Sequence, residues 1–195
     1  CADYVNSAEL LDSEKTTFAN WFANDMPEGD PNDMRNAPVQ FHAPLERIDV
    51  EVHMAEPYVP EVIGWPEGYR CHTLEWPETE TKYITGFEGD PGDDLAVHHI
   101  VYFMSPPGEL ADHYRGLDAA DPEPGYECEG GLFLYDLESS WLGTWSPGLV
   151  GSFGRYPTGT GIKVEPGSVV TALIHHDLSK NGGAGRTGFR ATVTD

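Results

Sequence analysis

Basic residues are scarce in this sequence, which has 11 lysines and arginines against 33 aspartates and glutamates, a formal net charge of −22. A surface this acidic repels the phosphates of nucleic acids and the headgroups of anionic lipids. We therefore expect no nucleic-acid partner. The sequence also lacks an apolar run of the roughly 20 residues that a membrane-spanning helix requires, so we expect no transmembrane segment.

The signature motifs of several enzyme classes are absent as well. The sequence has no Gly-rich phosphate-binding loop, no serine nucleophile elbow and no Cys-x-x-Cys-His haem attachment site. Its only cysteines are Cys1, Cys71 and Cys128. Cys71 and Cys128 adjoin strand-like segments, and they either pair in an oxidising compartment or remain buried thiols. Cys1 is a candidate for lipidation in an exported lipoprotein, or else it marks the boundary of a fragment.

Short apolar runs separated by turns make up most of the chain. With 22 glycines and 16 prolines in 195 residues, turns are frequent, which favours an all-β plan. We expect an antiparallel sandwich over residues 45–195. The expected strands are 46–54, 69–76, 82–88, 96–103, 131–136, 161–164, 168–176 and 188–193.

The N-terminal part of the sequence differs from the rest. Residues 8–24 have the spacing of a helix, with apolar side chains at steps of three and four: Leu11, Phe18, Trp21 and Phe22. Asp12 or Ser13 is expected to cap its start. Residues 26–44 are rich in Pro, Gly, Asn and Asp and are expected to form a linker. Residues 1–44 are thus predicted to be a short helix followed by a linker.

Two histidine pairs in apolar surroundings are the strongest functional signal. His98 and His99 lie inside the apolar run 95–103, and His175 and His176 end a second one. An imidazole is polar at both ring nitrogens, so placing it among Val, Ile and Phe is costly unless the nitrogens find partners. Histidines that converge from two strands suit a metal such as copper or zinc. The sequence therefore predicts a metal site.

Strand geometry complicates this prediction, because successive side chains of a regular strand point to opposite faces. His98 and His99 reach one metal only if a bulge redirects one ring, or if one binds through Nδ1 and the other through Nε2. The alternative is that one ring faces the metal and the other is an ordinary hydrogen-bonded histidine.

The other histidines have simpler interpretations. His53 falls on the polar side of an alternating strand and is expected to be solvated. His72 follows Cys71 at the start of a strand, where it either approaches the metal or caps the sheet. His113 is expected in a solvated loop, and His42 lies in the linker.

Six stretches of the chain, in this order, resemble a known family: 69–71 (Tyr-Arg-Cys), 83–88, 97–103 (with the double histidine), 145–148 (Trp-Ser-Pro-Gly), 156–162 and 172–176. Over roughly residues 46–195 the chain resembles the N-terminal domain of the copper type II, ascorbate-dependent monooxygenases. This family includes peptidylglycine α-hydroxylating monooxygenase and dopamine β-monooxygenase. The resemblance implies a jelly-roll-like sandwich of eight or nine strands.

The resemblance also implies a site. One copper ion would be bound by His98, His99 and a histidine of the last pair, at the position of His175. His176 is the alternate within that pair, and His72, from its own place in the sequence, is a second alternate. It further implies a disulfide between Cys71 and Cys128. In the family this copper cycles between Cu(I) and Cu(II), receives its electron from ascorbate, and passes it to a second copper where oxygen and substrate react.

The chain departs from the family in instructive ways. The second copper belongs to a C-terminal domain with two histidines and a methionine, and no such motif follows here. Leu173 stands where the animal enzymes carry a glutamine. The first residues resemble the end of a cytochrome c-like domain that precedes the copper domain in some bacterial relatives. We therefore expect an extracytoplasmic bacterial protein, a segment of a longer chain whose partners are a second copper domain or a cytochrome domain.

Three functions remain open from the sequence. The first is the electron-supplying copper domain of an oxidoreductase, an ascorbate-dependent monooxygenase. The second is an extracellular copper-binding or electron-transfer module without monooxygenase activity of its own. The third is a structural sandwich. The substrate is not encoded in these residues.

Overall fold

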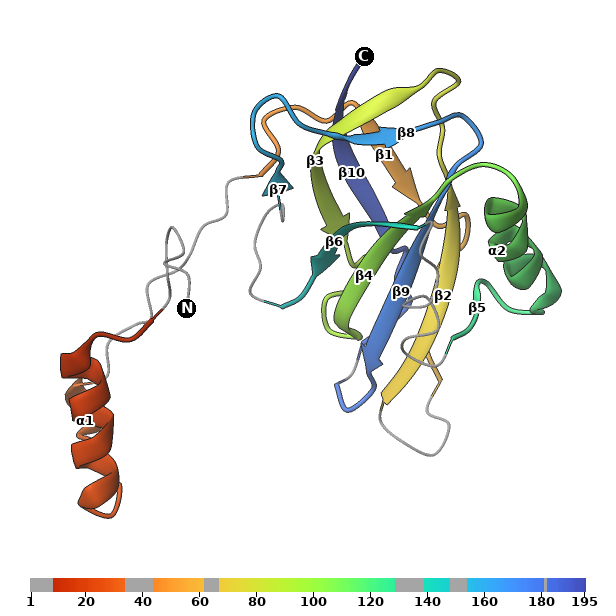
Figure 1. Ribbon diagram of the computed structural model, residues 1–195. Coiled ribbons are helices and arrows are strands. Elements are labelled where there is room, and N and C mark those ends of the chain that lie inside the picture. Colours follow the sequence, from red (N-terminus) through yellow and green to blue (C-terminus); the bar gives the residue numbers. More distant parts are fainter. Residues whose placement is uncertain (1–8, 34–43, 62–66, 129–138, 148–153, 181) are drawn as a thin grey trace. The chain divides into compact units, whose positions relative to one another are not determined.

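The computed structural model in Figure 1 describes residues 9–33, 44–61, 67–128, 139–147, 154–180 and 182–195. The chain forms two compact units, Cys1–Val39 and Gln40–Asp195. The sequence placed its division a few residues later, between residues 44 and 45. Each unit is described by itself below.

The first unit contains the expected helix in a shorter form, α1 (Asp12–Ala23), followed by the single 3-10 turn η1 (Pro31–Asp33). The expected caps were wrong, because the helix starts at Asp12 itself. The backbone N–H of Leu11 donates instead to the Glu14 carboxylate at 2.7 Å. The described residues of this unit are all exposed, including the apolar side chains that predicted the helix.

The second unit is a sandwich of two antiparallel five-stranded sheets (Figure 1), so the predicted β-sandwich is confirmed. Sheet 1 has the order β1-β10-β3-β7, and β8 also pairs with β3; its strands are β1 (Val50–His53), β3 (Lys82–Asp90), β7 (Gly154–Arg155), β8 (Ile162–Val164) and β10 (Gly188–Thr194). Sheet 2 has the order β5-β2-β9-β4-β6; its strands are β2 (Glu67–Glu75), β4 (Val97–Ser105), β5 (Tyr126–Glu127), β6 (Ser140–Trp145) and β9 (Val169–Asp177).

Ten strands are therefore described, rather than eight or nine. Seven of the expected segments coincide with strands, and the eighth, 131–136, lies outside the described residues. The sequence missed β5, β6 and β7. Two of these contain only two residues each, which is too short for an alternating pattern to be visible.

The main core lies between the two sheets, where alternate residues of each strand point inward. From sheet 2 it receives Ile100, Tyr102 and Met104 of β4 and Val170, Ala172 and Ile174 of β9; from sheet 1 it receives Val50, Ile84, Phe87, Phe189 and Ala191. The buried Tyr102 hydroxyl donates to the Gly188 carbonyl at 2.7 Å, so this polar group is satisfied across the sandwich.

A second, smaller core covers part of the outer face of sheet 2. Here the helix α2 (Glu109–Ala120) packs through Ala111 and Tyr114 against β2 and β5. The expected disulfide between Cys71 and Cys128 is present beneath it. The sequence missed α2, and the expectation of a loop around His113 was wrong: His113 is an exposed residue of this helix.

Truncating the main core should cost more stability than truncating the surface of the same strand. Phe87 is 1% exposed and contacts the rings of Tyr102 and Phe189. We expect Phe87→Ala to lower the free energy of unfolding by about 3–5 kcal/mol, since it leaves a cavity. The control Tyr83→Ala, 40% exposed on the same strand, should cost less than about 1 kcal/mol. Urea denaturation measures both, and equal losses would contradict this packing.

Candidate metal centre

Three histidines from two neighbouring strands meet on the outer face of sheet 2. His98 and His99 come from β4, and His175 comes from β9. Their Nδ1 atoms form a triangle. The His98 Nδ1 lies 3.1 Å from the Nδ1 of both other histidines, and the remaining His99–His175 side measures 3.4 Å. The three ligand positions implied by the family resemblance are thus brought together.

A β-bulge explains how two consecutive histidines reach the same place. Along β4 and β9, Val97 pairs with His176 and His99 pairs with His175, so that His98 is an extra residue opposite a regular strand. A bulge leaves the extra residue unpaired and changes the direction of its side chain. This is the first of the two solutions considered from the sequence. All three rings turn Nδ1 toward one another, so this arrangement does not require mixed Nδ1 and Nε2 binding.

The triangle has the size that a metal ion requires. An imidazole nitrogen lies about 2.0–2.1 Å from a bound copper or zinc ion. At near-tetrahedral angles, two nitrogens bound to the same ion are therefore roughly 3.3 Å apart. The three observed separations, 3.1, 3.1 and 3.4 Å, lie close to this value. The residues therefore fit an ion with three nitrogen ligands.

Hydrogen bonds alone do not satisfy this arrangement. Each neutral imidazole has one in-plane site at Nδ1, which carries either a proton or a lone pair. Three such atoms in mutual contact cannot form hydrogen bonds along every side of the triangle, because each proton forms a hydrogen bond along only one of the three sides. A cation is different, since it accepts all three lone pairs at once. The geometry therefore favours a bound ion over a hydrogen-bonded cluster.

The surroundings of the site favour a neutral His99 ring and orient the His175 ring. Partial burial, followed by the nearby His175 and His98, lowers the pKa of His99, which favours the neutral form that binds metals. His175 is only 7% exposed, and the ring of Tyr69 stacks on it at a centroid distance of 4.3 Å. His98, in contrast, is exposed. The centre is thus buried on the β9 side and open on the His98 side.

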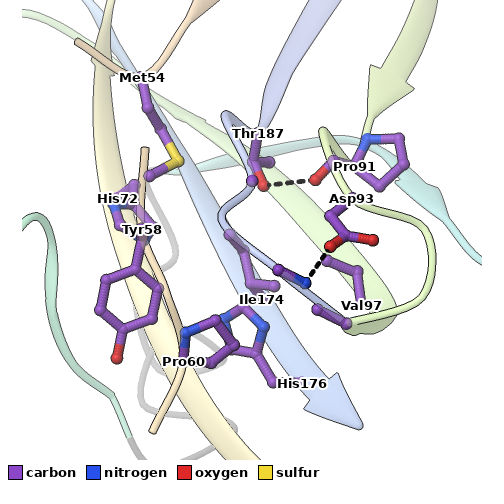
Figure 2. A pocket seen from close by; sticks show the side chains of 13 residues that line it. Met54, Tyr58, Pro60, His72, Pro91, Asp93, Val97, Ile174, His176 and Thr187 are labelled. Atoms are coloured by element: carbon purple, nitrogen blue, oxygen red, sulfur yellow. Dashed lines mark hydrogen bonds between the residues drawn. The ribbon is translucent and has the colours of Figure 1, made fainter. Parts of the chain in front are cut away.

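The two alternates, His176 and His72, lie on the opposite face of sheet 2 from the Nδ1 triangle. They line a small pocket between the sheets together with Met54 and Tyr58 (Figure 2). The Tyr58 ring lies between them, with centroid distances of 5.6 Å to His72 and 5.7 Å to His176. His176 faces Gly68 and His72 faces Ala172, so the backbones of the two histidines are roughly 13 Å apart along the strands, while both side chains contact the Tyr58 ring. Neither joins the three-histidine group.

Burial dominates the chemistry of these two inner histidines. Burial, with Arg70 and His176 nearby, lowers the pKa of His72 to about 3. Burial also lowers the pKa of His176 to about 4, against the opposing effect of a hydrogen bond with the Ala96 backbone. Both rings are therefore neutral at physiological pH, and they act as polar members of the core.

His53 is not part of the three-histidine group. The expectation of a solvated His53 was wrong: it is half-buried on β1, and its Nε2 lies 3.2 Å from the Asp90 carboxylate, which also pairs with Arg190. Asp90 is 37 residues from His53 in the sequence, so no local sequence pattern reveals this contact. His42 and Cys1 lie outside the described residues.

The comparisons with known proteins add no further assignment. No protein-family model matches the chain, and no curated protein matches it. Within the described ranges, no helix is long and apolar enough to cross a membrane.

The depressed pKa of His72 should make stability depend on pH. The unfolded chain protonates this ring below about pH 6.5, whereas the folded protein keeps it neutral down to about pH 3. Stability should therefore fall as the pH falls below 6.5. We expect His72→Gln to flatten this slope by up to about 1.4 kcal/mol per pH unit.

Urea denaturation between pH 4.5 and 7.5 measures the slope. The matched control is His113→Gln on the exposed face of α2, which should leave the slope as it is in the parent. A slope identical in the parent and in His72→Gln would show that His72 takes up its proton in the folded state.

Proposed function

We propose that this chain is the mononuclear copper-binding domain of an ascorbate-dependent monooxygenase-like protein. The observation that carries the proposal is the triangle of three Nδ1 atoms, formed by a bulge at His98 and by His175 on the neighbouring strand. The resemblance of residues 46–195 to the copper type II monooxygenases supports it, because that resemblance implies the same three residues as ligands.

The donor set favours copper. The group contains three imidazoles, with neither a thiolate nor a carboxylate among its members. Neutral nitrogen ligands suit both Cu(I) and Cu(II), and no hard anion favours the oxidised state. Copper bound here would supply one-electron chemistry at a fixed position. The protein's part is to hold the three lone pairs together, to orient His175 through Tyr69, and to leave the His98 side accessible.

In this proposal the domain receives electrons from ascorbate or a donor in its place. It passes them to a second copper in another domain or chain, where the substrate is hydroxylated. The Cys71–Cys128 disulfide supports an extracytoplasmic location, since disulfides persist in oxidising compartments. The partners are a second copper domain or a cytochrome domain.

The direct test is copper binding by the parent protein and by His98→Ala and His175→Ala. With one equivalent of Cu(II), the parent should give a single type II electron paramagnetic resonance signal with nitrogen couplings. Each variant should lose this signal and bind copper more than about 100-fold more weakly, because replacing groups that only support a ligand already costs 10–100-fold.

The matched control is His113→Ala, which removes an exposed histidine of α2 outside the group and should keep the parent spectrum. An unchanged spectrum in His98→Ala or His175→Ala would remove the shared site. One-electron cycling of the parent copper without substrate hydroxylation in the presence of its partner domain would instead favour an electron-transfer module.

A further inference from the structure

A groove of about 580 Å³ lies where the open edges of the two sheets come together, beside His72. One wall is the end of β1, the terminal strand of sheet 1, with the residues that follow it. The other is β2 from His72 to Glu75, beyond the two residues, Arg70 and Cys71, that pair with β5. The end of α2 and the loop after it complete the groove. Its volume lies within the range of about 300–1,000 Å³ that is typical of small-molecule sites.

The charged lining of this groove is acidic. Among the described residues that line it, none is a lysine or arginine and four are carboxylates: Glu56, Glu75, Asp118 and Glu123. Glu75 is paired with Arg115, and Asp118 accepts a hydrogen bond from the backbone of β2. Glu56 and Glu123 form no ion pair with any residue that the structure describes. Two carboxylates of the groove are therefore available to a cation.

Two arginines lie behind the walls, and both are already engaged. Arg70 is 5% exposed and pairs with Asp121 at 2.8 Å. Arg186 donates to the backbone carbonyls of Met54 and Ala55. Neither guanidinium group is part of the lining. The lining thus keeps its negative charge, which favours a positively charged ligand.

The spacing of the carboxylates excludes a metal ion as that ligand. In the described ranges, the one group of three or more histidine, cysteine or carboxylate side chains close enough to share an ion is the three-histidine group. Charge that is spread along a groove suits an organic cation instead. The lining also offers apolar side chains against which an alkyl chain can pack: Val52, Met54, Leu74, Pro122 and Pro124.

The buried imidazole of His72 points independently to a ligand. His72 is 3% exposed, and its Nε2 has no hydrogen-bond partner among the described residues. Buried polar atoms normally have one. The tip of the ring reaches the groove wall at Gly125, where an added Cβ would lie 2.6 Å from Cε1, the carbon bonded to Nε2. A hydrogen-bond donor held in the groove would supply the missing partner.

We propose that this groove binds a small organic cation of the alkylammonium class. An ammonium group carries three N–H donors, so it can pair with a carboxylate and donate to the neutral imidazole of His72 at the same time. The alkyl chain packs on the apolar part of the lining. This inference does not rest on the proposed function, because it names a ligand site apart from the three histidines and includes no redox step.

The test uses the metal-free full chain, with n-butylammonium as the probe and 1-butanol as its uncharged counterpart. Binding is followed by nitrogen-15 NMR of the labelled protein. At low salt we expect a dissociation constant on the order of 1 mM for the ammonium ion, and binding of butanol at least about tenfold weaker. The side-chain nitrogen signals of His72 should shift with the ammonium ion. Equal binding of the two probes, or no shift at His72, would overturn the proposal.

Charge removal at single carboxylates separates the groove from the general field of the protein. Glu56→Gln and Glu123→Gln should each weaken binding about threefold, and the double variant about tenfold. The matched control is Glu109→Gln, which makes the same change in net charge at the exposed start of α2, outside the groove. It should change the dissociation constant less than about twofold. An effect of Glu109→Gln equal to that of Glu56→Gln would overturn the site, because net charge alone would then attract the probe.

A blocked glycine–lysine–glycine peptide tests the other source of an ammonium group. Its lysine side chain has the charge and the alkyl chain of the small probe, but it is attached to a peptide backbone. Weaker binding of the peptide than of n-butylammonium is the expected result for a small-molecule site. Tighter binding of the peptide would overturn the proposal, since the groove would then be a surface for docking a protein. Failure of copper binding would contradict the proposed function and leave these titrations unaffected.

Discussion

The extra residue at His98 is the constraint on which the candidate site depends. In a regular strand, His98 and His99 would point to opposite faces of sheet 2, and at most one of them could meet His175. The bulge between Val97 and His99 places both rings on the outer face. The neighbouring strand then supplies the third ring, because His99 and His175 are direct partners in the ladder.

The same strand alternation gives two adjacent histidines different roles. His175 faces outward into the Nδ1 triangle, whereas His176 faces inward into the pocket that it shares with His72 and Tyr58. Burial of the inner rings lowers their pKa values to about 3 and 4, so they remain neutral. The outward-facing ring of His175 lies beside His98, which is exposed to solvent. A position in the core and a candidate ligand position thus lie one residue apart.

Much of this architecture could be predicted from the sequence, for physical reasons that are visible residue by residue. The alternation of Val50, Val52 and Met54 with polar residues and the long apolar run up to Ile174 identify core strands. Helix α2 was missed although Leu110, Tyr114 and Leu117 have the spacing of one helix face. Its contribution is to cover the disulfide and part of the outer face, which depends on contacts between distant segments.

The candidate ligand positions could be predicted from the sequence, but their geometry could not. Histidines among apolar residues indicated that polar partners or a metal must satisfy them. The bulge, the choice of Nδ1 by all three rings and the stacking of Tyr69 all depend on how β2, β4 and β9 are aligned. The pairing of His53 with Asp90 is similar, because it joins two strands that no local pattern connects.

The most direct test of the central claim is nitrogen-15 NMR of the labelled protein loaded with Cu(I), which is diamagnetic and gives observable ligand signals. The structure predicts three imidazoles, those of His98, His99 and His175, whose Nδ1 signals shift on metal binding while each Nε2 carries the proton. Binding through Nε2 by either residue of the His98–His99 pair, or a shift confined to two rings, would contradict the account of the bulge.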